Sequence, residues 1–498
     1  MLPLQQTYAE ALPELSVPWR ADLPPDPAIL WLNESLAVEL GLDPDWLRGP
    51  EGMALLTGQI DGTVAQAYAG HQFGSANPQL GDGRAVLLGE LIDTTGRRVD
   101  LHLKGSGRTP FARGGDGKAP LGPMLREAVI GEFLHAAGVP TTRALAVLTT
   151  GERIAPRQGV TPEPGALLVR VAASHLRVGT VQAAAWHHGP EVTGRLVDHV
   201  ITRHHPSADG PLGLLAAVTG AQAELVAQWM LLGFVHGVMN TDNMALSGEG
   251  IDYGPCAFLD VHRNQAVFSS IDRGGRYAYG NQPGIALWNL SRFAEVLLPV
   301  IDAEDPQRAV DAATAVLEGF EPAYRAAHAR GLAAKLGIPV GAASATGPAG
   351  DAIPTAGHAA APAAGGDDVT ALGADLFSLL EAQAIDHTGF FHALTDGDPE
   401  PLFTDPDPYR EWAVRRETLR GTGPDRASAA DAMAAANPVV IPRNLALDSA
   451  LRAAHLGDPG PVLDLLEAVA EPFAPVPGRE HLEGAGEGGD DFLTYCGT

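Results

Sequence analysis

The stretch that organises this chain is HGVMNTDNMALSGEGIDYG, residues 236–254. Its apolar run 244–246 is followed by four turn-forming residues and then by the start of a second apolar segment. This pattern predicts a hairpin that brings Asp242 and Asn243 on one arm close to Asp252 on the other. Carboxylate and amide oxygens held at short separation suit Mg²⁺. The sequence therefore predicts a magnesium site in this hairpin.

The same stretch has the form of a protein-kinase active site. In kinases, a loop with a His, and an Asn seven residues later, precedes a hairpin that ends in Asp-Phe-Gly. His236 and Asn243 have that spacing here, and Asp252 begins an Asp-Tyr-Gly triplet at the corresponding place. The kinase base Asp follows the His by two positions, where this chain has Val238. The usual catalytic carboxylate of a kinase is therefore missing.

Length and composition indicate a globular protein. With 498 residues we expect several structural units or one large bilobal fold, and 45% hydrophobic residues argue against disorder. The formal net charge of −27 argues against nonspecific binding to nucleic acids or anionic membranes, without excluding a local anion site. The start lacks a signal peptide, and no run approaches the roughly 18 apolar residues of a membrane span. We expect a soluble cytoplasmic protein whose oligomeric state the sequence leaves open.

The chain has two cysteines, Cys256 and Cys496, which excludes a disulfide scaffold and a Cys-rich zinc site. The histidine pairs at 187–188 and 204–205 lack matching carboxylates or cysteines, and we interpret them as solvated helix ends. A Gly-rich tail could carry Cys496 back over the active-site cleft. Two alternatives follow: a reversible Cys256–Cys496 disulfide that regulates access, or a buried Cys256 and a free surface thiol.

Glycine-rich turns adjoin the strands expected in the first part of the chain. The turn 81–84 precedes a strand over 85–91. A second strand, over 99–103, ends at Lys104, and the segment 101–118 holds four Lys or Arg residues against one Asp. Glycines let backbone N–H groups approach an anion closely, and the cations hold it. The alternatives are an anion site and a flexible basic surface loop.

A helix is expected over 121–137, where Glu127 shares a face with Ile130 and Leu134. A carboxylate on an apolar face needs a cation, and Lys104 is the obvious candidate. This pairing repeats that of a strand lysine with a helix glutamate in kinases. The alternative is an ordinary glutamate at the edge of a helix.

Two arginines follow in the next part of the chain. Arg170 lies in the strand expected over 166–171, and Arg177 lies shortly after it. Each guanidinium suits phosphate oxygens, and the alternative for each is a salt bridge to a nearby carboxylate. From Thr180 onward the pattern is helical. The helical segments are 181–204, 221–235, 285–301, 308–335, 369–384 and 445–470.

A strand-rich first part and a helix-rich second part predict an α+β, two-lobed, protein-kinase-like fold. An N-terminal extension and helical C-terminal additions complete it. The segment 339–366, made mostly of Ala, Gly and Pro, is interpreted as a disordered insertion. The expected organisation is an extension over 1–60, an N-lobe with nucleotide-binding loops over 61–180, a helical C-lobe with the hairpin over 181–480, and a flexible tail over 481–498.

Together these motifs resemble the selenoprotein O family, whose members are pseudokinase-fold protein adenylyltransferases. The resemblance rests on YAGHQFG, PQLGDGRA, LKGSGRTPFARGGDGKA, LVRVAASHLRVGT, HGVMNTDNM and IDYGPCAF, between residues 68 and 260, and on the terminal TYCGT. It implies that Asp242 is the proton acceptor, that Asn243 and Asp252 bind Mg²⁺, with Mn²⁺ as the alternative, and that Glu127 pairs with Lys104. The nucleotide contacts it implies are Gly81, Gly83, Arg84, Lys104, Asp116, Gly117, Arg170, Arg177 and Asp252.

The resemblance also implies that ATP binds inverted relative to kinases and that AMP is transferred to hydroxyl side chains of proteins. Three hypotheses follow. The first is an adenylyltransferase acting on Ser, Thr or Tyr of protein substrates. The second is a phosphotransferase with a displaced base, and the third is an inactive pseudokinase that binds ATP as a scaffold. The paired metal ligands weigh against the scaffold, and the sequence does not identify the protein targets.

Overall fold

An antiparallel sheet of eight strands forms one side of the molecule in the computed structural model, which describes residues 4–154, 162–339, 365–421, 425–484 and 492–494. The strand order is β1-β3-β6-β7-β10-β9-β2, and β8 pairs with β10 beside this path. The strands are β1 (Ser16–Pro18), β2 (Ala28–Leu32), β3 (Val64–Gln66), β6 (Ala85–Ile92), β7 (Arg98–Lys104), β8 (Ala119–Pro120), β9 (Arg143–Ile154) and β10 (Glu163–Ala172).

The two faces of the sheet pack into different hydrophobic cores. Leu87 of β6 joins the core that contains α5 (Leu121–Ala136), whereas its neighbours Val86 and Leu88 join the core that contains α2–α4. This division follows from the alternation of side chains along a strand. The helices on the second face are α2 (Glu34–Glu39), α3 (Pro44–Arg48) and α4 (Pro50–Leu56), and α1 (Thr7–Ala11) precedes β1.

The segment expected as an N-terminal extension, 1–60, is part of this sheet. It provides β1 and β2, the two ends of the strand order, and α2–α4 cover one face. Three short motifs elsewhere are the hairpin of β4 (Gly70–Gln72) and β5 (Ser75–Asn77) and the pair of β11 (Phe234–Val235) and β12 (Ala257–Phe258), with the 3₁₀ turn Thr241–Asn243 near them in sequence.

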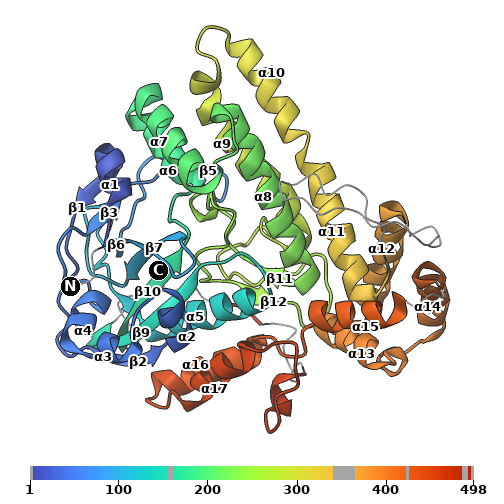
Figure 1. Cartoon of the computed structure of the whole chain (residues 1–498). Helices are drawn as coiled ribbons and strands as arrows, with labels where there is room; N and C mark the ends of the chain where they lie inside the picture. The colour runs from blue at the N-terminus through green and yellow to red at the C-terminus, as the bar shows by residue number, and fades with distance from the viewer. Residues whose placement is uncertain (1–3, 155–161, 340–364, 422–424, 485–491, 495–498) are drawn as a thin grey trace.

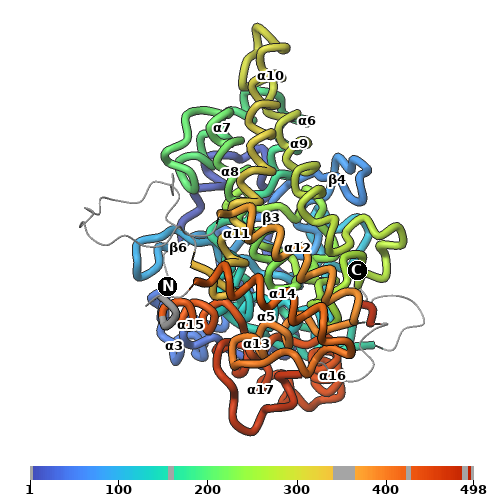
Figure 2. Tube along the Cα trace, turned by 90° about the vertical axis from the view of Figure 1, so that its right-hand side faces the viewer, coloured from blue at the N-terminus to red at the C-terminus, as the bar shows by residue number. Residues whose placement is uncertain are grey.

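Most of the described chain after β10 is helical. Figure 1 shows α6–α9 and α11 beside the sheet, α12–α15 at the far side from it, and α16 and α17 below α5. The view turned by 90° shows that α10 projects from the body (Figure 2). These helices are α6 (Val178–His187), α7 (Gly189–His204), α8 (Gly210–Leu232), α9 (Gln282–Ile301), α10 (Pro306–Leu317), α11 (Phe320–Leu336), α12 (Gly366–Ala382), α13 (His387–Asp396), α14 (Asp407–Arg420), α15 (Asp425–Ala436), α16 (Asn444–His455) and α17 (Gly460–Val469).

The strands and helices are consistent with the expected α+β class, and the helix predicted over 121–137 is confirmed as α5. Three of the longer predicted helices are wrong as single elements. Each is two helices in the structure. The segment 181–204 divides near Gly189 into α6 and α7, 308–335 divides near Gly319 into α10 and α11, and 445–470 divides near Gly457 into α16 and α17. The helix predicted over 221–235 ends earlier because Gly233 has a left-handed φ of 68° and closes α8.

The predicted hairpin over 244–251 is also wrong in its pairing. Among the described residues the 244–246 run bonds to the segment before α6, since Leu246 N donates to Leu176 O at 2.9 Å and Val178 N donates to Met244 O at 2.9 Å. The buried His236 closes the loop instead, with Nε2 2.9 Å from the carbonyl oxygen of Ile251. The two ends of the loop are still brought together, by the pairing of β11 with β12 and by the bond between His236 and Ile251.

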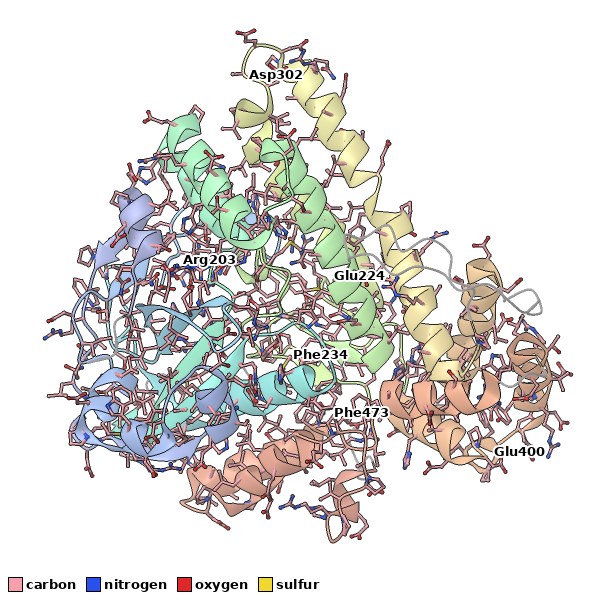
Figure 3. All side chains as sticks on the ribbon, in the orientation of Figure 1. Arg203, Glu224, Phe234, Asp302, Glu400 and Phe473 are labelled. Carbon is pink, nitrogen blue, oxygen red and sulfur yellow. The ribbon has the colours of Figure 1, made fainter. Side chains whose placement is uncertain are left out.

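Two of the described helices are long and apolar enough to cross a membrane by length and composition alone, which the sequence analysis did not expect. They are Gly210–Leu232 and the segment Tyr279–Ile301. α8 packs against α7, α9, α10 and α11, so neighbouring helices occupy the faces that lipid would need. Figure 3 shows Phe234, which follows α8, near the middle of the molecule. The composition of α8 is thus explained by its place in the core.

Most of the insertion expected over 339–366 lies outside the described residues. The same holds for the tail residues 485–491 and 495–498. Thr494 is described and is buried: its N–H donates to Phe268 O at 2.7 Å and its Oγ1 to Pro255 O at 2.8 Å. This part of the tail therefore lies against the loop that follows Asp252.

Candidate active site

A cavity of about 630 Å³ is lined by residues from the sheet, α5, the 236–254 segment and α16. A slightly larger cavity of about 700 Å³, lined by Trp31 and Glu132 among others, contains none of the predicted site residues. The smaller cavity contains both polar clusters described below. Its predicted residues are Arg84, Lys104, Glu127, Asp242, Asn243 and Asp252.

Four charged side chains form a closed cluster on one wall of this cavity. Lys104 Nζ lies 2.6 Å from Glu127 Oε2 and also donates to Asp252 Oδ1. Arg170 lies behind them, with Nε 2.6 Å from Glu127 Oε1 and Nη2 3.1 Å from Asp252 Oδ1. The predicted pairing of Lys104 with Glu127 is confirmed. Two cations and two carboxylates balance one another, with Lys104, Glu127 and Arg170 buried and Asp252 partly exposed to the cavity.

Electrostatics keeps both carboxylates of this cluster ionised. Burial alone would raise the pKa of Asp252, but Lys104 and Arg170 outweigh it and hold that pKa well below its usual range. Burial opposes ionisation of Glu127 in the same way, and Arg170 and Lys104 again lower its pKa. Asp252 also has a left-handed φ of 70°, which is uncommon for a residue other than glycine. The cluster fixes this strained residue at the cavity wall.

Asp242 has the opposite electrostatic character. It is 7% exposed, and burial raises the pKa of its carboxyl to about 6 despite the nearby Arg177. Its Oδ2 accepts a hydrogen bond from Gln72 Nε2 at 3.2 Å. Its Oδ1 is buried and has no hydrogen-bond partner among the described residues. A carboxylate with one fixed oxygen, one unbonded oxygen and a pKa near neutrality is suited to accept a proton.

The β4–β5 hairpin carries the residues that hold this carboxylate. Besides the bond from Gln72, His71 N donates to Thr241 Oγ1 at 2.7 Å, and Phe73 N donates to Asn240 Oδ1 at 3.1 Å. A Cβ on Gly70 would lie 2.7 Å from Asp242 Oδ1. The absence of a side chain at Gly70 therefore lets the β4–β5 hairpin pack directly against the buried Oδ1.

Asn243 and Asp252 lie on the same cavity and could hold a divalent cation. Asn243 Nδ2 donates to Val238 O at 3.0 Å, which leaves its amide oxygen as the possible ligand. In the described part of the chain no group of three or more His, Cys, Asp or Glu side chains could hold a metal. Mg²⁺ usually keeps several waters and binds substrate phosphates in addition to one or two protein ligands. The two residues fit that mode and do not form a complete protein cage.

The predicted nucleotide contacts divide into two groups. Arg84, Lys104 and Asp252 line the cavity, whereas Gly81, Gly83, Asp116 and Gly117 do not. These glycines instead permit close packing of the two loops. A Cβ on Gly81 would meet the ring of Phe111 at 2.4 Å, and one on Gly117 would meet Gly107 O at 2.0 Å. The structure thus shows a packing requirement for them, and their nucleotide contacts remain predictions.

The two predicted arginines are buried behind the cavity wall. For Arg170 the carboxylate alternative is the one observed, through Glu127 and Asp252. Arg177 donates to the carbonyl oxygens of Asp242 at 3.0 Å and His175 at 3.2 Å, and it stacks on Tyr68. Both arginines position functional residues in this structure, and direct phosphate contacts stay a prediction.

Several cavity residues were missed by the sequence analysis. Gln72 and Phe73 belong to YAGHQFG, a motif that carried the resemblance but received no role. On α16, the lining residues are Asp448, Leu451, Arg452 and His455, spaced as one helix face. Helical periodicity shows such a face, but it does not show which cavity the face borders. Arg113 and Arg126 add two further cations to the lining.

Backbone strain also concentrates here. Four described residues other than glycine have a left-handed φ, and three of them, Phe73, Arg113 and Asp252, line this cavity. Such conformations cost free energy and are found preferentially at functional sites. Together with the charge cluster and Asp242, they define a site for phosphoryl or nucleotidyl transfer.

Comparison with known proteins identifies the chain within this class. The family model described as "Protein adenylyltransferase SelO" matches residues 5–467. Proteins named "Protein nucleotidyltransferase YdiU" are similar over essentially their whole length. The one from Mycobacterium sp. (strain KMS) is 51% identical over 512 residues, covering 100% of this chain and 99% of that protein. Those of Pseudarthrobacter chlorophenolicus and Chromobacterium violaceum are 50% and 48% identical, covering 99% and 98% of this chain and 97% and 100% of the relatives.

The chain belongs to the SelO family of protein adenylyltransferases. The resemblance drawn from the motifs is confirmed, and the protein is a nucleotidyltransferase enzyme.

Proposed function

We propose that this enzyme transfers AMP from ATP to Ser, Thr or Tyr hydroxyl groups of protein substrates. The observation that carries the proposal is Asp242, whose buried Oδ1 has no hydrogen-bond partner among the described residues and whose pKa is raised to about 6. It lies on one cavity with the Lys104–Glu127 pair and with Asn243 and Asp252. A proton acceptor therefore faces the same space as the groups suited to a nucleotide.

In the proposed reaction Asp242 accepts the proton of the attacking hydroxyl group. The hydroxyl oxygen forms a bond to the α-phosphorus of ATP, the bond from that phosphorus to the bridging oxygen breaks, and pyrophosphate leaves. Gln72 fixes the second oxygen of Asp242, and Arg177 fixes its main-chain carbonyl. In-line displacement at phosphorus depends chiefly on such positioning and on charge neutralisation.

The cations that line the cavity supply the charge neutralisation. Lys104, Arg84, Arg113 and Arg126 come from the sheet, its loops and α5. A bound Mg²⁺, or Mn²⁺ in its place, would add Lewis-acid neutralisation of phosphate charge, with Asn243 and Asp252 as its protein ligands. The nucleotide is proposed to bind inverted relative to kinases. The absence of a carboxylate at Val238 and the presence of one at Asp242 support that orientation.

The wider organisation proposed here is a two-lobed, kinase-like fold, with lobes divided near residue 180 as the motifs suggest. The sheet and α5 on one side of the cavity and the 236–254 segment on the other support it. A cytoplasmic location is also proposed, and the acidic net charge of −27 supports protein partners over nucleic acids.

Redox control through Cys256 and Cys496 is a further part of the proposal. Cys496 lies outside the described residues, but Thr494, two residues before it, bonds to the carbonyl of Pro255, which precedes Cys256. Cys256 itself is buried, with Sγ 3.4 Å from Tyr253 O. The course of the tail up to Thr494 supports a role for the tail next to this loop.

The proposed reaction is tested by incubation with ATP labelled on either the α or the γ phosphate. Incorporation of the α label into protein, and not the γ label, is the expected result, with AMP located on a hydroxyl side chain by mass spectrometry. Incorporation of the γ label instead identifies a phosphotransferase. ATP binding with no transfer of either label identifies a scaffold.

A further inference from the structure

Three exposed apolar side chains lie at the edge of the active-site cavity. Phe73 is 37% exposed, Ile271 is 49% exposed and Leu493 is 45% exposed, and all three line the cavity that contains Asp242. They account for three of the twelve large apolar side chains that are exposed in the described chain. Exposed apolar residues are common singly, but a group at one opening indicates an interaction site. We refer to Phe73, Ile271 and Leu493 as the apolar lip.

A chain of contacts joins the members of the apolar lip. The rings of Phe73 and Tyr277 lie 5.2 Å apart, and Tyr277 N donates to Asp272 Oδ2 at 2.7 Å, next to Ile271. Ser270 N, on the other side of Ile271, donates to Thr494 O at 3.0 Å, next to Leu493. The lip is thus assembled from three segments that are far apart in the sequence.

Phe73 is held at the lip at an energetic cost. Its φ of 51° is left-handed, a conformation that a bulky aromatic residue rarely adopts. Its N–H donates to Asn240 Oδ1 and to Tyr277 OH, both at 3.1 Å, and these hydrogen bonds fix it there. An Asn or Gly at this turn would avoid the strain. An exposed aromatic ring maintained in a strained turn indicates selection for what the ring contacts.

The position of the lip identifies what it contacts. Phe73 adjoins Gln72, whose side chain bonds to Asp242, the proposed proton acceptor. The attacking hydroxyl must reach Asp242, so the polypeptide that carries it must pass over the residues beside Asp242. The nucleotide phosphates, in contrast, require the cations of the opposite elements, Lys104 and Arg126 among them. Apolar groups beside the acceptor oxygen therefore suit the protein substrate better than the nucleotide.

We propose that the apolar lip binds an apolar side chain next to the accepting Ser, Thr or Tyr of the protein substrate. This inference rests on the proposed function and specifies its substrate class. The lip removes apolar area from water on substrate binding. The enzyme thus selects hydroxyl groups in an apolar sequence context.

The test uses synthetic peptides with one central Ser, Thr or Tyr, flanked on both sides by Leu or, in the matched set, by Asn. Binding is measured by fluorescence polarisation without ATP, and AMP transfer is measured with α-labelled ATP. We expect the wild-type kcat/KM to be about tenfold higher for the Leu-flanked peptides, the effect of burying one apolar side chain. Ile271→Asn and Phe73→Asn should reduce this ratio toward one and leave the KM for ATP unchanged. Asn at 73 tolerates the left-handed backbone, and Val414→Asn, at an exposed residue of α14, is the matched control.

The outcomes separate the two proposals. Equal kcat/KM values for both peptide sets in the wild type, or a ratio that the lip variants do not change, overturns the apolar lip as a substrate site. A raised KM for ATP in those variants, with peptide preference retained, assigns the lip to nucleotide binding and also overturns the lip as a substrate site. Preferential binding of Leu-flanked peptides without AMP transfer supports the lip and contradicts the proposed reaction.

Discussion

The side chain of Gln72 donates a hydrogen bond to Oδ2 of Asp242 at 3.2 Å across a sequence separation of 170 residues. This bond couples the β4–β5 hairpin to the loop that carries the proposed base. It leaves Oδ1 of Asp242 as the oxygen able to accept a proton, and it favours the ionised carboxylate. The reactivity of the base thus depends on a residue outside its own loop.

Asp242→Asn should abolish most AMP transfer while preserving ATP binding. The amide has nearly the same shape but cannot accept the proton, and loss of a general base typically costs about 10²–10⁴ in rate. Turnover is measured with α-labelled ATP and nucleotide affinity by calorimetry. Near-normal turnover in this variant would show that Asp242 is not the base.

The pH profile should reveal the same group. Because the pKa of Asp242 is raised to about 6, wild-type kcat/KM should fall as pH decreases through about 6, where the carboxylate becomes protonated. Gln72→Ala removes a hydrogen bond that lowers this pKa, so the acidic limb should move to higher pH. The profiles are compared on one peptide substrate. If the acidic limb of the kcat/KM profile is unchanged in Gln72→Ala, the titration belongs to a group other than Asp242.

Glu127→Gln should destabilise the fold strongly. It leaves Asp252 as the remaining carboxylate partner of Lys104 and Arg170 among the described residues, and breaking a buried pair costs about 3–5 kcal/mol in the free energy of unfolding. The control is Glu224→Gln, which breaks the exposed pair with Arg330 and should cost about 0–1 kcal/mol. Glu224 lies on α8, away from the sheet (Figure 3). Urea unfolding of both variants provides the comparison, and similar losses would contradict a buried, coupled cluster.

Val238→Asp tests the orientation of the nucleotide. The side chain lines the cavity, so the variant places a carboxylate at the kinase position. If the nucleotide is inverted, this carboxylate has no γ-phosphate to act on, and transfer of the γ label should remain absent. Robust phosphorylation by this variant would favour the phosphotransferase with a displaced base. Val414→Asp serves as a control for added negative charge at an exposed residue.

Cys496→Ser tests the proposed redox control. Oxidised glutathione, as the acceptor of two electrons, should lower the activity of the wild type by joining Cys256 and Cys496, and a reductant should restore it. The variant should be insensitive to both. AMP transfer is assayed before and after each treatment, and peptide mapping identifies the disulfide. Equal responses in both proteins, or none in either, would exclude the clamp.

The sequence predicted those parts of the site that short motifs encode. Lys104 ends a strand and Glu127 lies on the apolar face of a helix, so their pairing follows from local periodicity and the need to neutralise a buried charge. For Arg170, phosphate and carboxylate partners are chemically equivalent choices, and only the fold shows that Glu127 and Asp252 lie within reach.

The parts that could not be predicted depend on long-range packing. The 244–246 run has strand character, but the sequence does not show that it bonds to the segment before α6. The short strands β1 and β2 likewise could not be predicted, because they are defined by their pairing at the two ends of the sheet. Nothing in the local sequence shows that the β4–β5 hairpin places the side chain of Gln72 beside Asp242.

Gly70 has a consequence for how activity can be lost in this family. A methyl group there would lie 2.7 Å from Oδ1 of Asp242, too close for the present packing, and none of the charged residues at the cavity would change. A single substitution could therefore convert the enzyme into a nucleotide-binding protein without turnover, with every acidic and basic side chain intact. Inspection of charged residues alone would miss such a change.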